Sequence, residues 1–248
     1  MTRTIRLATL KVENLFARYR FRKSEDVYVD EGFTVNQLAF DIYNDVEKAI
    51  TAKAIKAVDA DIWCLQEVES LPLLDFFNST YLAAQKYKHR IVVDGNDSRY
   101  IDVAVLSRYP IVEIRSHRHE RTAAGNAALF SRDCLKVVLD IEGKRLTLYV
   151  NHRKSMIGGR AETHPRCNEQ ADRVAEIVNE DWQDGGYEGN FVVLGDINDY
   201  VDAQTSLGSL VAHPGLVNIL DRAPESERWT HRYNGGGDYR HLDLSAPG

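Results

Sequence analysis

The chain has 248 residues, of which 44% are hydrophobic and 27% are charged, and its formal net charge is −6. This balance is typical of a folded protein and excludes collagenous, low-complexity and intrinsically disordered chains. No stretch approaches the roughly 20 apolar residues that a membrane-spanning helix needs, and the first residues lack the apolar block of a secretory signal. We therefore expect a cytoplasmic protein.

Short strand-like runs alternate with helix-like stretches along the chain. Strands are predicted over residues 5–9, 62–66, 89–93, 103–106, 135–139, 146–151 and 191–195. Apolar residues at helical spacing predict amphipathic helices over residues 35–58 and 168–182. A hairpin is predicted between residues 136–140 and 146–150, with its turn at 142–144. This order indicates a mixed α/β layered structure, and because no linker or repeat divides it, we expect one domain over residues 1–248.

The three cysteines, Cys64, Cys134 and Cys167, are widely spaced and include no CxxC pair. Neither a disulfide framework nor a thiolate zinc site is therefore expected. We interpret the three as small buried apolar residues.

The negative net charge argues against a protein that coats nucleic acid by bulk attraction, because that mode needs many cations facing phosphates. Two local basic clusters remain: Arg18, Arg20, Arg22 and Lys23, and Arg115, His117, Arg118, His119 and Arg121. Each cluster is interpreted either as part of a substrate-binding surface or as solvated loop charge.

Acids, amides and one histidine directly follow three apolar strands of the prediction. They are Glu67, Asn151, His152, Asp196, Asn198 and Asp199. The carboxyl ends of strands are where open α/β sheets build sites, and oxygen-rich clusters suit a hard ion such as Mg²⁺ or Mn²⁺. Such a cluster favours phosphate chemistry, in which the metal neutralises charge and a carboxylate positions or deprotonates water. Each residue also has an ordinary structural interpretation as a solvated, capping or turn residue.

Five segments carry a resemblance to a known family. They are LQEVES (65–70), YIDVAVLSRYPI (100–111), YVNHRKSM (149–156), VVLGDINDY (192–200) and YRHLDLS (239–245). In this order they resemble the successive motifs of the endonuclease/exonuclease/phosphatase superfamily, and the resemblance covers essentially the whole chain. It implies an α/β fold in which a two-layered sandwich of β-sheets is covered by helices on both sides. The four layers follow in the order α/β/β/α, which is the DNase I-like fold. It also implies a metal-dependent phosphoesterase acting on DNA, RNA, phosphoinositides or sphingomyelin.

The resemblance assigns roles to the residues at the strand ends. Glu67 would be the principal ligand of Mg²⁺ or Mn²⁺, and Asp196 would bind metal and orient or deprotonate the attacking water. Asn198 would contact metal or phosphate. His152, with Asn151 beside it, matches the histidine that hydrogen-bonds the scissile phosphate.

Further residues take weaker roles by the same resemblance. Glu13 is a second metal candidate. Asp102 and Lys154 are expected to support the site and contact phosphate, and Arg99 to contact substrate. Tyr100 stands where relatives often have glycine, so it would narrow the phosphate cleft or offer a stacking face.

The first strand departs from the family pattern, because Lys11 stands where relatives have an asparagine that supports the metal site. An inward ammonium would repel a metal ion, or would compete for Glu67 as an ion-pair partner. The alternative is that Lys11 extends outward into solvent.

The second departure is at the end of the chain. Family members continue past residues 239–245 into a further strand and a loop with a catalytic histidine, whereas this chain ends at Gly248. By resemblance, Asp243 matches the carboxylate that orients this histidine, and it is included among the catalytic candidates. His241 would project to the same strand face and is the local alternative. We therefore expect a truncated domain that lacks the last strand and loop, with reduced stability and activity.

From the resemblance we expect a nuclease-like, Mg²⁺- or Mn²⁺-dependent phosphodiesterase that acts as a monomer on nucleic acid, by in-line attack of metal-assisted water on phosphorus. Three alternatives stay open. The first is a phosphatase acting on a small or lipid phosphoester, and the second is a catalytically impaired family member that serves as a binding protein. The third is an unrelated α/β domain.

Overall fold

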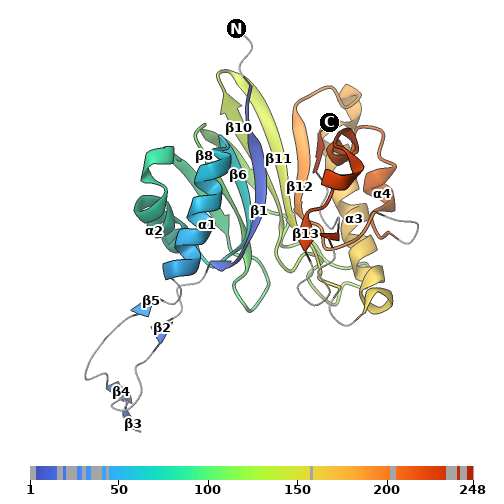
Figure 1. Ribbon diagram of the computed structural model, residues 1–248. Helices are drawn as coiled ribbons and strands as arrows, with labels where there is room; N and C mark the ends of the chain where they lie inside the picture. The colour runs from blue at the N-terminus through green and yellow to red at the C-terminus, as the bar shows by residue number, and fades with distance from the viewer. Residues whose placement is uncertain are drawn as a thin grey trace.

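Four layers stack in the molecule. The computed structural model describes residues 4–15, 19–20, 27–29, 32–34, 41–42, 45–156, 159–201, 205–232, 239–240 and 245–247. Helices α1 (Asp45–Val58) and α2 (Leu71–Tyr81) cover the outer face of one sheet, and α3 (Arg160–Trp182) and α4 (Gly208–Val211) cover the outer face of the other (Figure 1). The predicted α/β/β/α sandwich is confirmed.

The first sheet has the strand order β1-β6-β8-β7. Its strands are β1 (Leu7–Leu15), β6 (Ile62–Val68), β8 (Asp102–Ser107) and β7 (His89–Val93). β1 runs parallel to β6, and the other neighbours are antiparallel. Every residue of β6 is buried, because the strand has a helix layer on one side and the second sheet on the other. This double burial explains the continuous apolar run IWCL with which the strand begins.

The second sheet has the order β15-β12-β11-β10-β9. Its strands are β15 (Ser245–Pro247), β12 (Phe191–Asp196), β11 (Lys144–His152), β10 (Cys134–Ile141) and β9 (Ile111–Arg115). β10 and β11 form the predicted hairpin, and its two turn residues, Glu142 and Gly143, have φ of 55° and 88°. Two positive φ values are the geometry of the tight turn that suits a twisted hairpin. β11 and β12 are parallel.

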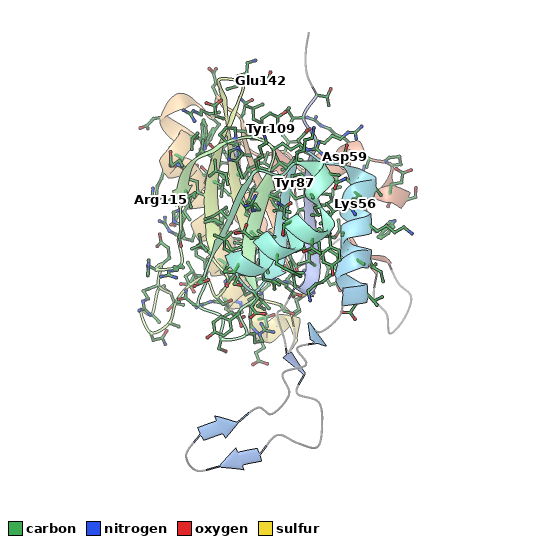
Figure 2. All side chains as sticks on the ribbon, turned by 90° about the vertical axis from the view of Figure 1, so that its left-hand side faces the viewer. Lys56, Asp59, Tyr87, Tyr109, Arg115 and Glu142 are labelled. Atoms are coloured by element: carbon green, nitrogen blue, oxygen red, sulfur yellow. The ribbon has the colours of Figure 1, made fainter. Side chains whose placement is uncertain are left out.

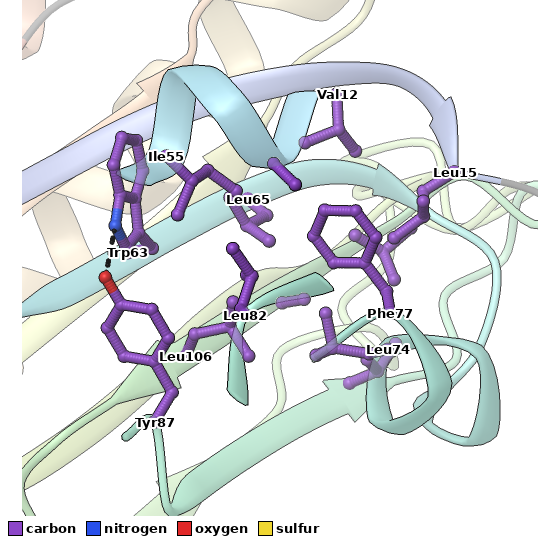
Figure 3. Packing of buried hydrophobic residues seen from close by; sticks show 14 of the residues in the cluster. Val12, Leu15, Ile55, Trp63, Leu65, Leu74, Phe77, Leu82, Tyr87 and Leu106 are labelled. Atoms are coloured by element: carbon purple, nitrogen blue, oxygen red, sulfur yellow. Dashed lines mark hydrogen bonds between the residues drawn. The ribbon is translucent and has the colours of Figure 1, made fainter. Parts of the chain in front are cut away.

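Three apolar clusters hold the layers together. One lies between the sheets and joins Cys64 and Val105 of the first sheet to Leu148 and Leu194 of the second. A second packs α1 and α2 on the first sheet, and Figure 3 shows Trp63 there, donating its indole N–H to the Tyr87 hydroxyl at 2.9 Å. The third packs α3 on the second sheet. The two sheets are therefore fixed against each other along their length.

Short elements complete the described chain. They are the 3-10 turns η1 (Ala83–Gln85), η2 (Gln183–Gly185), η3 (Ile219–Arg222) and η4 (Glu225–Glu227), and the strands β2 (Tyr19–Arg20), β3 (Val27–Val29), β4 (Gly32–Thr34), β5 (Asp41–Ile42), β13 (His231–Arg232) and β14 (Tyr239–Arg240). β2 pairs with β5, β3 with β4, and β13 with β14. Within the described ranges, no helix is long and apolar enough to cross a membrane.

The predicted elements hold with two corrections. The helix predicted over residues 35–58 begins only at Asp45, and Asp41–Ile42 is a strand. The helix predicted from residue 168 begins earlier, at Arg160. Helix α2 and strand β9 were not predicted. All three cysteines are buried and free, as expected. The prediction that a last strand and loop are missing stays a prediction.

Candidate active site

Three predicted site residues lie at the carboxyl ends of their strands: Glu67 in β6, His152 in β11 and Asp196 in β12. Because β11 and β12 are parallel and in register, His152 and Asp196 are direct neighbours. His152 Nε2 lies 3.6 Å from Asp196 Oδ2, and both side chains are buried. The strand pairing thus places the imidazole against the carboxylate.

The backbone turns sharply at two of the predicted residues. Glu67 lies in a β-bulge, because Gln66 pairs with Val103 and Val68 with Asp102 while Glu67 is skipped. The φ of Glu67 is 70° and that of Asn198 is 53°, values that side-chain-bearing residues seldom adopt. Bulges next to active sites redirect a side chain, and strained residues concentrate at such sites.

Burial controls the charge of the His152–Asp196 pair. Desolvation, helped by the charges of Arg132 and Lys11, lowers the pKa of His152 to about 2. The imidazole is therefore neutral at neutral pH, and its contact with Asp196 is not an ion pair. Burial also raises the pKa of Asp196, against the opposing effect of Lys11 and Arg132. A carboxylate with a raised pKa is a better proton acceptor than an exposed aspartate.

Lys11 faces the site. Its Nζ lies 3.4 Å from Oε1 of Glu67, and its side chain is 43% exposed while that of Glu67 is 12% exposed. Of the two alternatives from the sequence, the ion pair with Glu67 is the one that the structure shows.

Arg132 is a site residue that sequence reasoning missed. Its buried guanidinium donates to Asp97 Oδ2 at 3.3 Å and to the carbonyl of Arg153. Asp97 in turn accepts two hydrogen bonds from the guanidinium of Arg99, at 2.9 and 2.8 Å. These contacts hold the pKa of Asp97 at about 2. Two guanidinium groups are therefore fixed beside His152 by one carboxylate.

The predicted hairpin held the signal for Arg132. In its register, Cys134 pairs with Asn151, so the residues before Cys134 lie beside those after Asn151. Continuing this register by two residues places Arg132 opposite Arg153, the residue that follows His152.

The main chain of Arg153 links the parts of the site. Its N–H donates to the carbonyl of Asp196 at 2.9 Å, and its own carbonyl accepts from Asn198 Nδ2 at 3.1 Å as well as from Arg132. Its side chain is fully buried, donates to the carbonyl of Cys167, and has its pKa lowered by burial to about 10. This buried arginine fixes the loop that follows β11.

The remaining predicted residues are placed less centrally. Asn151 is buried and donates to the carbonyl of Tyr149 at 2.9 Å. Lys154 is half-buried, and its main-chain N–H donates to Gln170 at 3.1 Å. Tyr100 is 63% exposed and has a φ of 55°, which explains why glycine would suit its position.

Several predictions fall outside what the structure describes. The side chain of Glu13 and the residues Asp243 and His241 are outside the described part, and so are Arg18, Arg22, Lys23 and the side chain of Arg20. In the second basic cluster, His117 is buried and its backbone N–H donates to Asp133, whereas Arg115 and Arg121 are exposed. That cluster is therefore only partly a surface feature.

The donors at the site suit a hard metal ion. Among the described side chains, no group of three or more His, Cys, Asp and Glu residues gathers to hold a metal. The oxygen donors of Glu67, Asp196 and Asn198 nevertheless match the preference of an ion such as Mg²⁺, which binds through one or two carboxylates and keeps several waters. We conclude that these residues fit a divalent ion.

The fold and the strand-end acids define a DNase I-like sandwich, the architecture of phosphoester hydrolases. A family model described as "Endonuclease/Exonuclease/phosphatase family" matches residues 6–214. The chain belongs to this family, whose members are hydrolases that use divalent metals. Among curated proteins, no sequence matches this chain.

Solved structures share the fold at low sequence identity. Truncated TDP2 from Caenorhabditis elegans is 17% identical, with a TM-score of 0.60 over 81% of this chain and 75% of that one. The human Nocturnin catalytic domain, with a bound sulfate anion, is 15% identical, with a TM-score of 0.61 over 81% and 74%. Sphingomyelinase C from Streptomyces griseocarneus is 20% identical, with a TM-score of 0.56 over 83% and 77%. These likenesses support the fold alone.

Proposed function

We propose that this chain is a Mg²⁺- or Mn²⁺-dependent phosphodiesterase that cleaves nucleic acid as a single-domain monomer. The observation that carries the proposal is the buried contact of His152 with Asp196, 3.6 Å apart at the ends of two parallel strands. A neutral histidine beside a carboxylate of raised pKa supplies a hydrogen-bond donor and a proton acceptor in one place.

Each side chain of the site has a separate role in the proposed reaction. Asp196 accepts the proton of the attacking water, and the neutral imidazole of His152 donates a hydrogen bond to a phosphate oxygen. Arg132 adds a fixed positive charge behind them, where water is excluded and charge acts most strongly. The amide of Asn198 is oriented by its donation to the carbonyl of Arg153, so that its oxygen is available to a metal ion and its second N–H can donate to phosphate.

The metal ion would be held by Glu67, Asp196 and Asn198, with Glu13 as a further candidate. When bound, such an ion lowers the pKa of water and neutralises charge that develops on the phosphate. Asp243 and Asn151 are retained as catalytic candidates, and Asp102 as a supporting residue.

Nucleic acid is the proposed substrate because cations gather at this end of an acidic protein. Lys11, Arg99, Arg132 and Lys154 lie in or beside the site, although the chain has a net charge of −6. Three of these cations also contact acids of the site, and cationic side chains in this position can contact the phosphates of a polyanion. In the proposal Arg99 and Lys154 contact phosphates of the backbone, and Tyr100 offers a ring against which a base can stack.

A second candidate function follows from the Lys11–Glu67 ion pair, which occupies a predicted metal ligand. In that case the chain is an impaired member of the family that binds a ligand without turnover. A phosphatase acting on a small or lipid phosphoester is the third candidate, and the salt dependence of hydrolysis separates it from a nuclease.

The test is hydrolysis of plasmid DNA and of bis(4-nitrophenyl) phosphate with Mg²⁺, Mn²⁺ or chelator. Asp196→Ala is expected to lower the metal-dependent rate by about 10³-fold or more. The matched control is Asp184→Ala, which removes an exposed acid of η2 at the opposite end of the second sheet and is expected to keep the wild-type rate. Equal and negligible rates in all three proteins would favour the impaired member, and turnover in chelator would contradict the proposal.

A further inference from the structure

Lys11 makes direct contact with an acid of the proposed metal site. It belongs to β1, which pairs with β6 so that Lys11 lies opposite Gln66, next to the bulged Glu67. The ammonium lies 3.4 Å from the Glu67 carboxylate, and nearly half of the lysine side chain is exposed. The contact is therefore close but open to solvent.

The same ammonium also acts on Asp196. Strand β1 contacts β12 across the two sheets, which brings Lys11 near the second acid. Lys11 and Arg132 are the cations whose charges act on Asp196, and Glu67 is the acid whose charge acts on it. Lys11 thus lies in the field of two carboxylates that repel each other.

The other cations of the site have their own partners. Arg99 is held by Asp97, and Arg132 is held by Asp97 and the carbonyl of Arg153. Their positions are fixed by these contacts, whereas Lys11 is a flexible chain with a compact charge that can move into solvent.

We propose that Lys11 is the counter-ion of the Glu67–Asp196 pair in the metal-free protein, and that a divalent ion binds by displacing its ammonium. The two cations cannot share the site at low energy, because like charges a few ångströms apart repel. Lys11 therefore weakens metal binding and sets the metal concentration at which the site fills. This inference rests on the proposed function, since it takes Glu67 and Asp196 as metal ligands.

The test is calorimetric titration of the purified chain with Mn²⁺. Lys11→Met keeps the apolar part of the side chain but removes the charge. This variant is expected to bind Mn²⁺ about five- to tenfold more tightly than wild type, because the metal ion no longer has to break a partly exposed ion pair or to approach an ammonium group. Lys11→Gln, a second neutral variant, should show the same increase in Mn²⁺ affinity. Lys11→Arg keeps the charge and should stay within about twofold of wild type by the same reasoning.

The matched control is Lys56→Met. Lys56 is an exposed lysine in the last turn of α1, close to Asp59 (Figure 2). It precedes the start of β6, whereas Glu67 lies near the end of that strand. Its removal changes the net charge equally and should leave Mn²⁺ affinity unchanged.

Thermal melting gives an independent readout. In chelator, Lys11→Met should melt about 2 °C below wild type, because the two carboxylates lose their counter-ion, and saturating Mn²⁺ should remove the deficit. Equal Mn²⁺ affinity, or equal melting in chelator, for wild type and both neutral variants would overturn the role of Lys11 while leaving the proposed function intact. If wild type and all variants fail to bind Mn²⁺, the metal site of the proposed function fails as well.

Discussion

Gly195 holds the backbone of β12 against β11 one residue before Asp196. Its φ is 129°, and a Cβ atom built there would lie 2.0 Å from the carbonyl oxygen of Asn151. No flexible side chain can yield at this contact, because the obstacle is the backbone of the neighbouring strand. The carboxylate of Asp196 is therefore placed by a position that tolerates only glycine.

Gly195→Ala is expected to lower the free energy of unfolding by about 2–4 kcal/mol, through strain and displaced strands. It should also reduce metal-dependent turnover, because Asp196 moves with its backbone. Urea denaturation measures the first effect and the phosphodiester assay the second. The control is Gly208→Ala in α4, where a Cβ meets open space, and it should be nearly neutral. An unchanged stability of Gly195→Ala would contradict this account of the strand contact.

The sequence predicted the strand-end residues but not the groups that surround them. Glu67, His152 and Asp196 stand next to apolar runs, so their place at strand ends follows from pattern alone. Arg132 lies before a strand, and its burial depends on Asp97 from a different loop. The hairpin register places Arg132 beside the end of β11, but its contact with Asp97 joins distant segments and has no sequence period, and so a single sequence does not reveal that contact.

At the scale of elements, the loop between β7 and β8 presents Asp97, Arg99 and Tyr100 to the site. Asp102, the first residue of β8, closes this loop by accepting the N–H of Gly95 at 2.8 Å. Burial raises the pKa of Asp102 to about 6 from an ordinary value of 3.8, and the nearby acids Asp94, Asp97 and Asp133 add to the shift. The loop is therefore held by a carboxyl group that takes up a proton more readily than an exposed aspartate.

The sign of the pH effect follows from this raised pKa. The folded protein binds the proton more tightly than the unfolded chain, so the stability from Asp102 is complete below about pH 4 and is lost as pH rises through about 6. The loss is up to about 3 kcal/mol. Asp102→Asn keeps an oxygen for Gly95 and has no such titration. Urea denaturation at pH 4.5 and 7.5 should show that the free energy of unfolding of the variant rises relative to that of wild type as pH rises. A difference between the two proteins that is the same at both pH values would contradict the raised pKa of Asp102.

The elements that the sequence failed to predict have recognisable causes. Helix α2 begins after Ser70, whose Oγ accepts the N–H of Leu73, and Pro72 lies in its first turn. These are start signals of a helix, and they lie directly after the motif at residues 65–70. Helix α3 begins before Pro165 because Thr163 and Cys167 are buried, although its first turns are mostly polar. In that case tertiary burial outweighed local pattern.

At the scale of the whole molecule, charge is unevenly distributed. The chain is acidic, yet the site at the strand ends carries Lys11, Arg99 and Arg132, with Lys154 on the next loop. A polyanion that meets several of these cations releases counter-ions when it binds, and a substrate with one charge does not. The proposed substrate therefore has a signature that can be measured without knowing its sequence.

If three phosphates are contacted, kcat/KM for DNA should fall about 40-fold between 50 and 200 mM salt, with a logarithmic slope near −3. The rate with bis(4-nitrophenyl) phosphate should change by less than about twofold over the same range, because one exposed charge is weakly affected by screening. Arg99→Met removes a guanidinium that is 61% exposed and should reduce the slope for DNA by about one. Lys56→Met, far from the site, should leave the slope unchanged.

The comparison of the two substrates decides between the proposed activities. A steep salt dependence of kcat/KM for DNA that Arg99→Met reduces means that the cations at the strand ends contact the phosphates of a nucleic-acid backbone. Equal, shallow salt dependence for both substrates means that the site recognises one phosphoester group, as a phosphatase of small or lipid substrates would. In that outcome the positive charges serve to hold the site's own acids, which is the role that Arg132 and Lys11 already have toward Asp97 and Glu67.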